Sequence, residues 1–371
     1  MKILLCFGTR PEAIKMAPLY QELRRCNFEV EVCVTGQHRE MLDQVLDFFE
    51  IQPKYDLQLM KQRQSLNQLS ARILSEADNV LNDFQPYVVL VHGDTTTSTM
   101  MAMAAFHKGI KVAHVEAGLR THNKQSPFPE ELNRQLTARI ADYHFVPTIR
   151  AENNLKNENI ISNNIIVTGN TVVDALQLGL QKIENGFVSE DLISVKRYWD
   201  TSKKLVLVTG HRRESFGEGF EKICKAIATI AKEENVQIIY PVHLNPNVQE
   251  PVHRILGILK NVILLPPVDY PAFIFLMQQS YLIITDSGGI QEEAPSLGKP
   301  VLVTRTTTER PEAIESGTVI LVGKEEEKIV SVCKELLNNQ ELYSEKSKKH
   351  NPYGDGNASR RIVNFIKQLN F

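Results

Sequence analysis

Short runs of apolar residues alternate with longer mixed segments along most of the chain. The runs are continuously apolar rather than alternating, which is typical of strands buried on both faces of a parallel sheet. The segments between them show helical periodicity, as at 11–24 and 220–233. Two series of alternating strands and helices predict an α/β protein with two doubly wound, Rossmann-like domains. The expected strands are 1–7, 29–35, 88–92, 112–116, 143–146 and 166–169 in the first half, and 205–209, 237–241, 262–265, 282–285 and 301–303 in the second.

The pattern changes near Gly169 and Asn170, where we expect the domain boundary. Beyond it, the charged stretch 183–204 is typical of surface helix and connection. A turn-rich run at 351–357 precedes an amphipathic helix that begins at Ala358. We therefore expect an N-terminal domain of residues 1–169, joined by the C-terminal helix 357–371, and a C-terminal domain of residues 170–356.

Composition narrows the class of protein. The 371 residues suit two domains, and 42 Lys and Arg against 44 Asp and Glu argue against a nucleic-acid binder. Five cysteines without a C-x-x-C pair predict neither a zinc site nor a disulfide framework, which favours a reducing compartment. The N-terminal apolar run is too short for a signal peptide, and no run reaches the length of a membrane span. We expect a soluble cytoplasmic protein that binds no membrane and no metal.

Three carboxylates lie where chemistry is expected in such a fold. Ligands of open α/β sheets bind at the carboxyl ends of the strands. Asp94 follows one expected strand, Glu116 ends the next, and Glu130 lies between a proline pair and a helix. Each alone is typical of a helix cap. Three carboxylates converging on one place suit proton transfer, because burial and mutual repulsion raise a carboxyl pKa toward neutrality.

Several strand ends carry groups suited to an anion. Arg10 and Lys15 follow the first strand, where they either hold an anion or are solvated charges at a helix start. His211 and its neighbouring arginines follow residues 205–209 and suit a pyrophosphate, the alternative being a basic surface turn.

The strongest local signal for a nucleotide is Asp286-Ser287-Gly288-Gly289, between a strand and a helix. Ser287 is expected to cap the helix, and the two glycines would let a diphosphate reach free backbone N–H groups. Glu293 would accept hydrogen bonds from a ribose, and Arg310 would lie nearby. An ordinary helix cap is the alternative for Ser-Gly-Gly taken alone.

These motifs together resemble the non-hydrolysing UDP-N-acetylglucosamine 2-epimerases, over essentially the whole chain and in the right order. The resemblance implies a GT-B fold, with two Rossmann-like domains facing each other across a cleft, and a homodimer. It implies interconversion of UDP-GlcNAc and UDP-ManNAc for surface polysaccharide precursors. The motifs are Gly8-Thr9-Arg10-Pro11-Glu12, His92-Gly93-Asp94-Thr95, residues 115–121 (VEAGLRT), Pro129-Glu130-Glu131, residues 210–214 (GHRRE), residues 286–293 (DSGGIQEE), residues 308–313 (TERPEA) and residues 351–358 (NPYGDGNA).

The resemblance also implies roles for single residues. Phe273 resembles the aromatic residue that contacts the uracil, and Phe128 stands where many members carry Trp. The implied catalytic residues are Asp94, Glu116, Glu130 and His211. The implied substrate-binding residues are Arg10, Lys15, Arg134, Phe273, Ser287, Gly288, Gly289, Glu293 and Arg310. Bacterial members bind a second UDP-GlcNAc as an activator, and the residues matching that site are Gln37, Arg63, Arg212 and His243.

Inversion at carbon 2 of the sugar has chemical requirements that do not depend on the resemblance. No carbonyl lies beside that carbon, so its inversion needs either transient oxidation or elimination of a leaving group. Neither the dinucleotide motif G-x-G-x-x-G nor a P-loop occurs, so elimination of UDP without a cofactor is favoured. Three alternatives remain open: a hydrolysing 2-epimerase that releases ManNAc and UDP, a GT-B glycosyltransferase, and a nucleotide-sugar sensor without activity.

Overall fold

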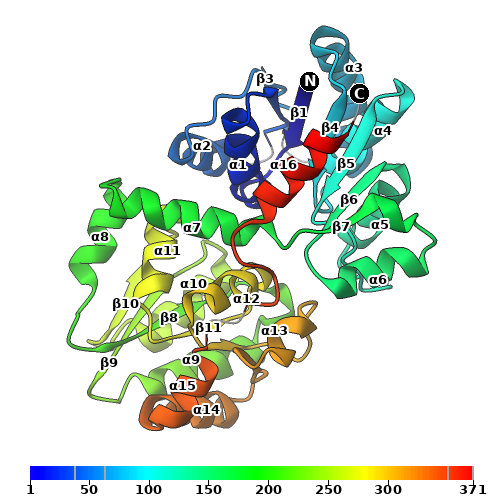
Figure 1. The fold of residues 1–371 in the computed structure, drawn as a ribbon. Coiled ribbons are helices and arrows are strands. Elements are labelled where there is room, and N and C mark those ends of the chain that lie inside the picture. The colour runs from blue at the N-terminus through cyan, green and yellow to red at the C-terminus, as the bar shows by residue number, and fades with distance from the viewer. Residues whose placement is uncertain (37–38, 62–63, 349–350, 370–371) are drawn as a thin grey trace. The chain divides into compact units, whose positions relative to one another are not determined.

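The chain divides into two compact units, each built on one parallel sheet (Figure 1). The computed structural model describes residues 1–36, 39–61, 64–348 and 351–369. The first unit comprises Met1–Leu178 and Tyr353–Phe371, and the second comprises Gly179–Pro352. Helices connect the parallel strands in both units, which confirms the predicted α/β class with two doubly wound sheets.

The sheet of the first unit has the strand order β3-β2-β1-β4-β5-β6-β7. The order reverses between β1 and β4, and such a reversal leaves a crevice at the carboxyl ends of the strands. The strands are β1 (Lys2–Phe7), β2 (Glu29–Val34), β3 (Tyr55–Asp56), β4 (Val88–His92), β5 (Lys111–Val115), β6 (Tyr143–Val146) and β7 (Ile165–Val167). The helices are α1 (Arg10–Arg25), α2 (Arg39–Phe48), α3 (Leu66–Phe84), α4 (Thr96–His107), α5 (Glu130–Ile140), α6 (Ile149–Asn157), η1 (Ser162–Asn164), α7 (Thr171–Glu184, continuing into the second unit) and α16 (Ala358–Gln368).

The sheet of the second unit has the order β10-β9-β8-β11-β12-β13, with its reversal between β8 and β11. Its strands are β8 (Lys204–Thr209), β9 (Val236–Pro241), β10 (Val262–Leu265), β11 (Leu282–Thr285), β12 (Val301–Val303) and β13 (Val319–Leu321). Its helices are α8 (Glu190–Tyr198), η2 (Arg213–Ser215), α9 (Glu218–Ile230), α10 (Pro246–Leu256), α11 (Tyr270–Gln279), α12 (Gly288–Glu293), η3 (Ala294–Leu297), α13 (Pro311–Glu315), α14 (Glu326–Asn338) and α15 (Gln340–Lys346).

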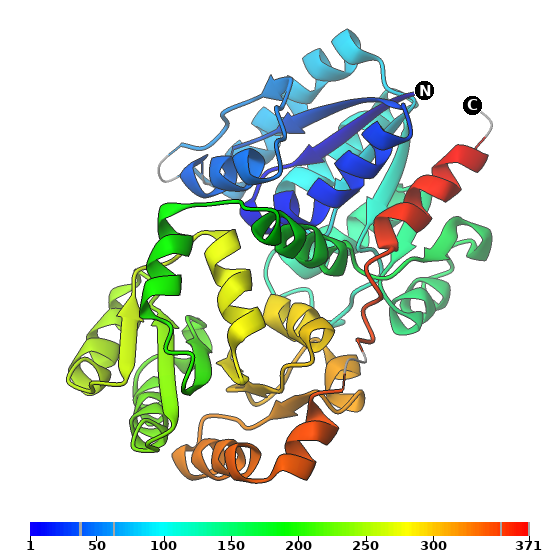
Figure 2. The same ribbon diagram turned by 60° about the vertical axis from the view of Figure 1, so that its left-hand side comes forward.

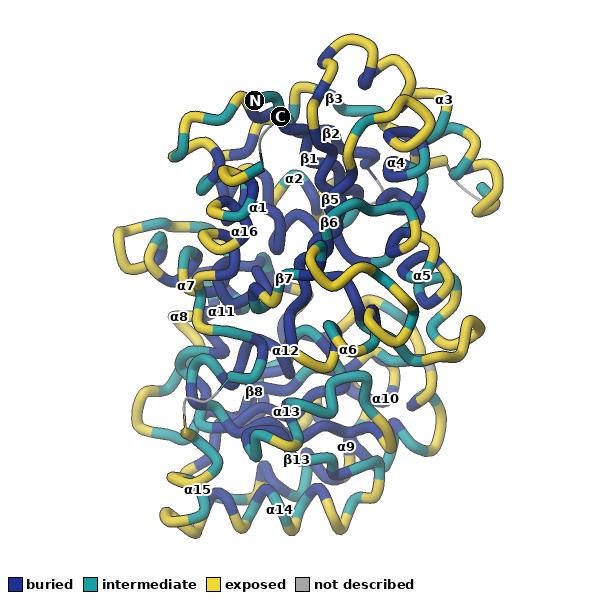
Figure 3. Tube along the Cα trace, turned by 45° about the vertical axis from the view of Figure 1, so that its right-hand side comes forward, coloured by how far each residue is buried: buried dark blue, intermediate teal, exposed yellow. Residues whose placement is uncertain are grey.

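Burial follows the expected pattern. The central strands of both sheets are buried, the edge strands β3, β7, β10 and β13 are partly exposed, and the helices are exposed along one side (Figure 3). All five residues of β4 are buried, which explains why its sequence is apolar throughout. The sequence analysis missed β3, which has only two residues, and β13, which has three.

The C-terminal segment belongs to the first unit. Helix α16 lies beside α1 (Figures 1 and 2), and its Phe365 ring packs edge-on against Phe145 at a centroid distance of 5.6 Å. The Asp174 carboxylate of α7 accepts hydrogen bonds from the backbone N–H groups of Ala358 and Ser359, at 3.2 and 2.7 Å. Because these contacts tie the first turns of α7 to the tail, the first unit extends to Leu178, beyond the boundary expected at residue 169.

Candidate active site

Neighbouring strands of the first unit deliver two of the predicted carboxylates. Asp94 follows β4, and Glu116 follows β5, its parallel neighbour. The backbone turns sharply at both ends, with φ of +64° at Gly93 and +61° at Glu116. A side chain other than glycine is strained in this left-handed region, by an amount on the order of 1 kcal/mol. Such strain is characteristic of functional positions, and here it sets the direction in which the Glu116 side chain leaves the sheet.

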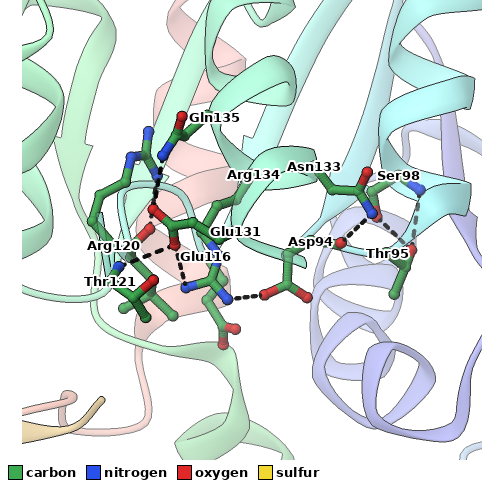
Figure 4. Close-up of polar contacts among 12 residues, drawn as sticks. Asp94, Thr95, Ser98, Glu116, Arg120, Thr121, Glu131, Asn133, Arg134 and Gln135 are labelled. Atoms are coloured by element: carbon green, nitrogen blue, oxygen red, sulfur yellow. Dashed lines mark hydrogen bonds and ion pairs between the residues drawn. The ribbon is translucent and has the colours of Figure 1, made fainter. Parts of the chain in front are cut away.

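The Asp94 carboxylate lies against a buried arginine (Figure 4). Arg134 extends from α5 and donates from Nη2 to Oδ2 of Asp94 at 2.6 Å. Its Nη1 lies 3.6 Å from the Glu131 carboxylate. Glu131 is fully buried and also accepts hydrogen bonds from the backbone N–H groups of Thr121 and His122, so the loop after β5 and the start of α5 hold each other in place.

The charges around Asp94 set its protonation. Burial raises the pKa of Asp94 above its usual value; Arg134 opposes the rise, whereas Glu116 and Glu130 add to it. Glu130 is the first residue of α5, and its charge contributes to the raised pKa of Asp94. Its part in the chemistry stays a prediction. A carboxyl group whose pKa is raised and which is held by a cation is suited to take up and return a proton.

Glu116 is held by two donors on one oxygen. Lys15 of α1 and the side-chain amide of Asn170 both donate to Oε2, the amide at 2.7 Å. We expected Lys15 to face an anion, and in this structure the anion that it contacts is Glu116. Nε2 of His92 lies 3.7 Å from the same oxygen, and neither nitrogen of this buried ring hydrogen-bonds to any described residue. Burial lowers the pKa of His92 to about 4, so the ring is neutral above that pH.

The second unit places its predicted residues on both sides of its own strand-order reversal. His211 follows β8, and Asp286 follows the adjacent β11. Oδ2 of Asp286 accepts from the backbone N–H groups of His211 and Arg212, both at 2.8 Å. Nδ1 of His211 lies 3.7 Å from Oδ1 of Asp286, and its ring stacks on His243 at 5.2 Å. Burial lowers the pKa of His211, although the Asp286 charge opposes this shift.

The Ser-Gly-Gly turn opens α12, as predicted, with one difference. Ser287 is the N-cap residue, yet its side chain makes no capping hydrogen bond; the expected cap was wrong. The turn is held instead by the Ser287 backbone N–H, which donates to the Thr285 hydroxyl at 2.9 Å. A Cβ built on Gly288 would lie 3.5 Å from Cζ of Arg310, so this arginine runs along the glycine backbone. The start of α12 therefore combines helix N–H groups with a cation, which is the chemistry of a diphosphate site.

Arg310 and Glu293 have protein partners. Nε of Arg310 donates to the buried Glu292 carboxylate at 2.7 Å, which fixes the guanidinium beside the turn. Glu293 accepts a hydrogen bond of 3.2 Å from the hydroxyl of Tyr270. Phe273 lies one turn further along α11 and is half-buried.

The remaining predicted residues are less fully defined. Arg10 is half-buried at the start of α1. Of the four residues matched to a second nucleotide-sugar site, Arg212 and His243 lie in the second unit, whereas Gln37 and Arg63 lie outside the described residues. Within the part of the chain that the structure describes, no group of three or more His, Cys, Asp or Glu side chains is placed to hold a metal ion. Nor is any described helix long and apolar enough to cross a bilayer.

Sequence reasoning missed three residues that hold the site together: Glu131, Asn170 and Asp286. Glu131 and Asp286 lie inside motifs that we used, but their partners are backbone N–H groups that only the folded loops bring near. Asn170 directly follows the last strand run of the first half, and this position was the available signal.

The sequence of this chain matches a family model and several related proteins. Residues 21–367 match the family model described as UDP-N-acetylglucosamine 2-epimerase. The chain is 56% identical over 370 residues to the UDP-N-acetylglucosamine 2-epimerase of Yersinia pestis, covering 99% of this chain and 98% of the relative. It is 53% identical over 371 residues to the enzyme of that name from Campylobacter jejuni, covering 98% and 97%.

Two solved structures are also similar to this chain. The UDP-GlcNAc 2-epimerase of Neisseria meningitidis, bound to UDP-GlcNAc, has a TM-score of 0.93 and 49% identity, covering 100% of both chains. The UDP-GlcNAc 2-epimerase of Methanocaldococcus jannaschii, in complex with UDP-GlcNAc and UDP, has a TM-score of 0.82 and 34% identity over 100% of both.

Proposed function

Because the chain belongs to the UDP-N-acetylglucosamine 2-epimerase family, whose fold is the two-domain GT-B fold, we propose that it interconverts UDP-GlcNAc and UDP-ManNAc. The observation that carries the proposal is the carboxylate pair at the ends of β4 and β5. Asp94 and Glu116 follow adjacent strands, each is held by a cation, and the pKa of Asp94 is raised. This provides proton-transferring groups where the fold binds its ligands.

The proposed reaction is an elimination followed by a re-addition. A carboxylate removes the proton from carbon 2, its electron pair forms the double bond between carbons 1 and 2, and the carbon 1–oxygen bond to UDP breaks. The products held by the enzyme are a glycal and UDP. A carboxylic acid then returns a proton to the opposite face of carbon 2, and UDP re-adds at carbon 1. Two faces need at least two acid–base groups, and we propose that these come from the three carboxylates Asp94, Glu116 and Glu130.

The second unit is proposed to hold the nucleotide. Gly288 and Gly289 at the start of α12, with Arg310 beside them, suit the diphosphate, and Glu293 suits the ribose. Phe273 is proposed to contact the uracil. His211 is proposed to assist the departure of the diphosphate. The Asp286 carboxylate fixes the loop that carries this histidine. In the first unit, Arg10, Lys15 and Arg134 are proposed to contact the substrate.

Incubation with UDP-GlcNAc tests this function. The expected result, followed by NMR, is a mixture of UDP-GlcNAc and UDP-ManNAc that is reached from either direction, with the sugar still linked to UDP. Stoichiometric release of free ManNAc and UDP would instead support the hydrolysing reaction. Transfer to an acceptor without epimerisation would support a glycosyltransferase.

We also propose activation by the substrate. Arg212 and His243, with Gln37 and Arg63, match the activator site of bacterial family members. Reactions started with UDP-ManNAc alone should be slow and should accelerate when a trace of UDP-GlcNAc is added. Full activity on UDP-ManNAc alone would contradict this regulation.

The resemblance further supports a homodimer in the cytoplasm, where the five free cysteines stay reduced. Light scattering should give twice the chain mass of 42.1 kDa.

A further inference from the structure

We propose that Asn170 is a positioning residue for the Glu116 carboxylate, and that the C-terminal segment 353–359 fixes Asn170 in this role. The inference rests on the proposed function, because that function makes Glu116 a catalytic group. It assigns a part in the reaction to a tail that lies far from the carboxylates in the sequence.

The Asn170 amide has one orientation that fits its neighbours. Its Nδ2 donates to Oε2 of Glu116 at 2.7 Å, and its Oδ1 accepts from the backbone N–H of Val172 at 3.0 Å. A flipped amide would set oxygen against carboxylate and NH2 against N–H, so the hydrogen-bond pattern fixes the assignment. Asn170 is 2% exposed, and water does not compete for these bonds. The amide therefore serves both as a cap for α7 and as a donor to Glu116.

The backbone of the tail holds Asn170 directly. The N–H of Asn170 donates to the carbonyl of Tyr353 at 2.6 Å. The preceding Gly169 has φ of +87°, and a Cβ there would lie 3.1 Å from the Tyr353 oxygen and 3.3 Å from Cα of Gly354. A side chain at this position would be strained by the positive φ and would crowd the tail, so glycine suits this approach of two backbones. Tyr353 itself is buried, which anchors the tail in the first unit.

A second contact anchors the tail to the same helix. Asp174, in the first turn of α7, accepts hydrogen bonds from the backbone N–H groups of Ala358 and Ser359. The N-cap residue of α16, Asn357, makes no capping hydrogen bond of its own, so Asp174 caps α16 from another helix. The tail therefore contacts Asn170, just before α7, and Asp174, in its first turn. Asn170 is the one of the two that contacts Glu116. A continuous set of hydrogen bonds runs from α16 through α7 to Glu116, all within the first unit.

The competing explanation is that Asn170 only caps α7. Asn170→Ser separates the two roles, because serine retains a capping acceptor but is too short to reach Glu116. We expect kcat to fall about 10-fold or more with KM changed less than about threefold, as misplacement of a reacting group produces. The acid limb of kcat should also move to higher pH, because a donor to the charged carboxylate is lost. Lys15, His92 and Asp94, which are charged or titratable groups near Glu116, are unchanged in this variant.

The matched control is Thr148→Ala, which removes the capping side chain of α6 in the same unit. It should lower stability and leave kcat and the pH profile unchanged. Wild-type kcat in Asn170→Ser, or an equal loss in Thr148→Ala, would overturn the positioning role. An inactive but folded wild-type protein would instead remove the proposed function, so the two failures are distinguishable.

The part of the tail is tested by a double-mutant cycle. Asp174→Ala removes the anchor of α16 without touching Glu116, and should lower kcat at least about threefold. If the tail acts through Asn170, Asp174→Ala should have no further effect in the Asn170→Ser background. Equal fold-losses in both backgrounds would show that the tail does not act through Asn170.

Discussion

Arg134 donates a hydrogen bond of 2.6 Å to the Asp94 carboxylate and thereby sets a buried cation against a group whose burial raises its pKa. Removal of this cation should raise the pKa of Asp94 further, because Arg134 favours the charged carboxylate. A base must be deprotonated to act, so kcat/KM is lost as the pH falls through its pKa. The acid limb of kcat/KM for Arg134→Met should therefore move to higher pH.

The pH profile of kcat/KM for Arg134→Met measures this shift. Arg139→Met is the matched control, because Arg139 is an exposed arginine on the same helix, α5. The control should retain the wild-type profile. An acid limb that stays in place in Arg134→Met would contradict the role given to Asp94.

Asp286 holds the loop that carries His211. Its carboxylate accepts two backbone hydrogen bonds, and Asp286→Ala would leave both N–H groups without this partner. We expect kcat/KM to fall about 10-fold or more, with most of the effect absent in a His211→Ala background. Steady-state kinetics of the single and double variants check this. Multiplicative losses would indicate that Asp286 acts independently of His211.

Gly288 tests the diphosphate site without disturbing the fold. A methyl group there would meet the Arg310 side chain at 3.5 Å, which is ordinary contact, and the backbone is not in the left-handed region. Gly288→Ala should therefore keep the wild-type melting temperature. Because the methyl group would lie over the N–H groups that face the ligand, we expect the Kd for UDP, measured by calorimetry, to rise about 10-fold or more. An unchanged Kd would show that the start of α12 does not bind the diphosphate.

Three buried histidines make the first unit sensitive to acid. Burial lowers the pKa of His92 and His144 to about 4, and that of His114 to about 3. In the unfolded chain these rings bind protons below about pH 6.5, whereas the folded rings stay neutral until the pH is much lower. The free energy of unfolding should therefore fall as the pH drops from about 6.5 to 4, by about 1.4 kcal/mol per pH unit for each ring.

Urea unfolding at several pH values measures this slope. His144→Gln should reduce it, because one proton-binding group is lost from the unfolded chain. His107→Gln, at an exposed position, is the control and should leave the slope nearly unchanged. A slope that does not respond to His144→Gln would contradict the neutral buried state of that ring.

Much of the site could be predicted because of one rule of α/β folds. Asp94, Glu116 and His211 directly follow strands that are recognisable as apolar runs, and strand ends are where such folds bind ligands. The partners of these residues could not be predicted in the same way. Lys15 was expected to contact a substrate anion, but its contact with Glu116 depends on how α1 crosses the sheet. Asn170 gains its role from a tail more than 180 residues away, and no local pattern reports such a contact.

Ser287 shows that a local rule also predicts a contact that does not form. Its type and position predicted a capping side chain, yet Thr285 holds the turn through the Ser287 backbone instead. Glycines at the next two positions leave the start of α12 open, and this openness matters for an anion more than the cap does.

In the proposed reaction carbon 2 loses and regains a proton through side chains of this chain, and turnover in D2O follows that proton. UDP-GlcNAc and UDP-ManNAc recovered at equilibrium should carry deuterium at carbon 2, as seen by mass spectrometry and by loss of the H2 signal in NMR. Asp94→Asn and Glu116→Gln should slow this exchange together with epimerisation. Epimerisation without deuterium at carbon 2 would contradict the elimination mechanism. Full exchange in both variants would contradict proton transfer by Asp94 and Glu116.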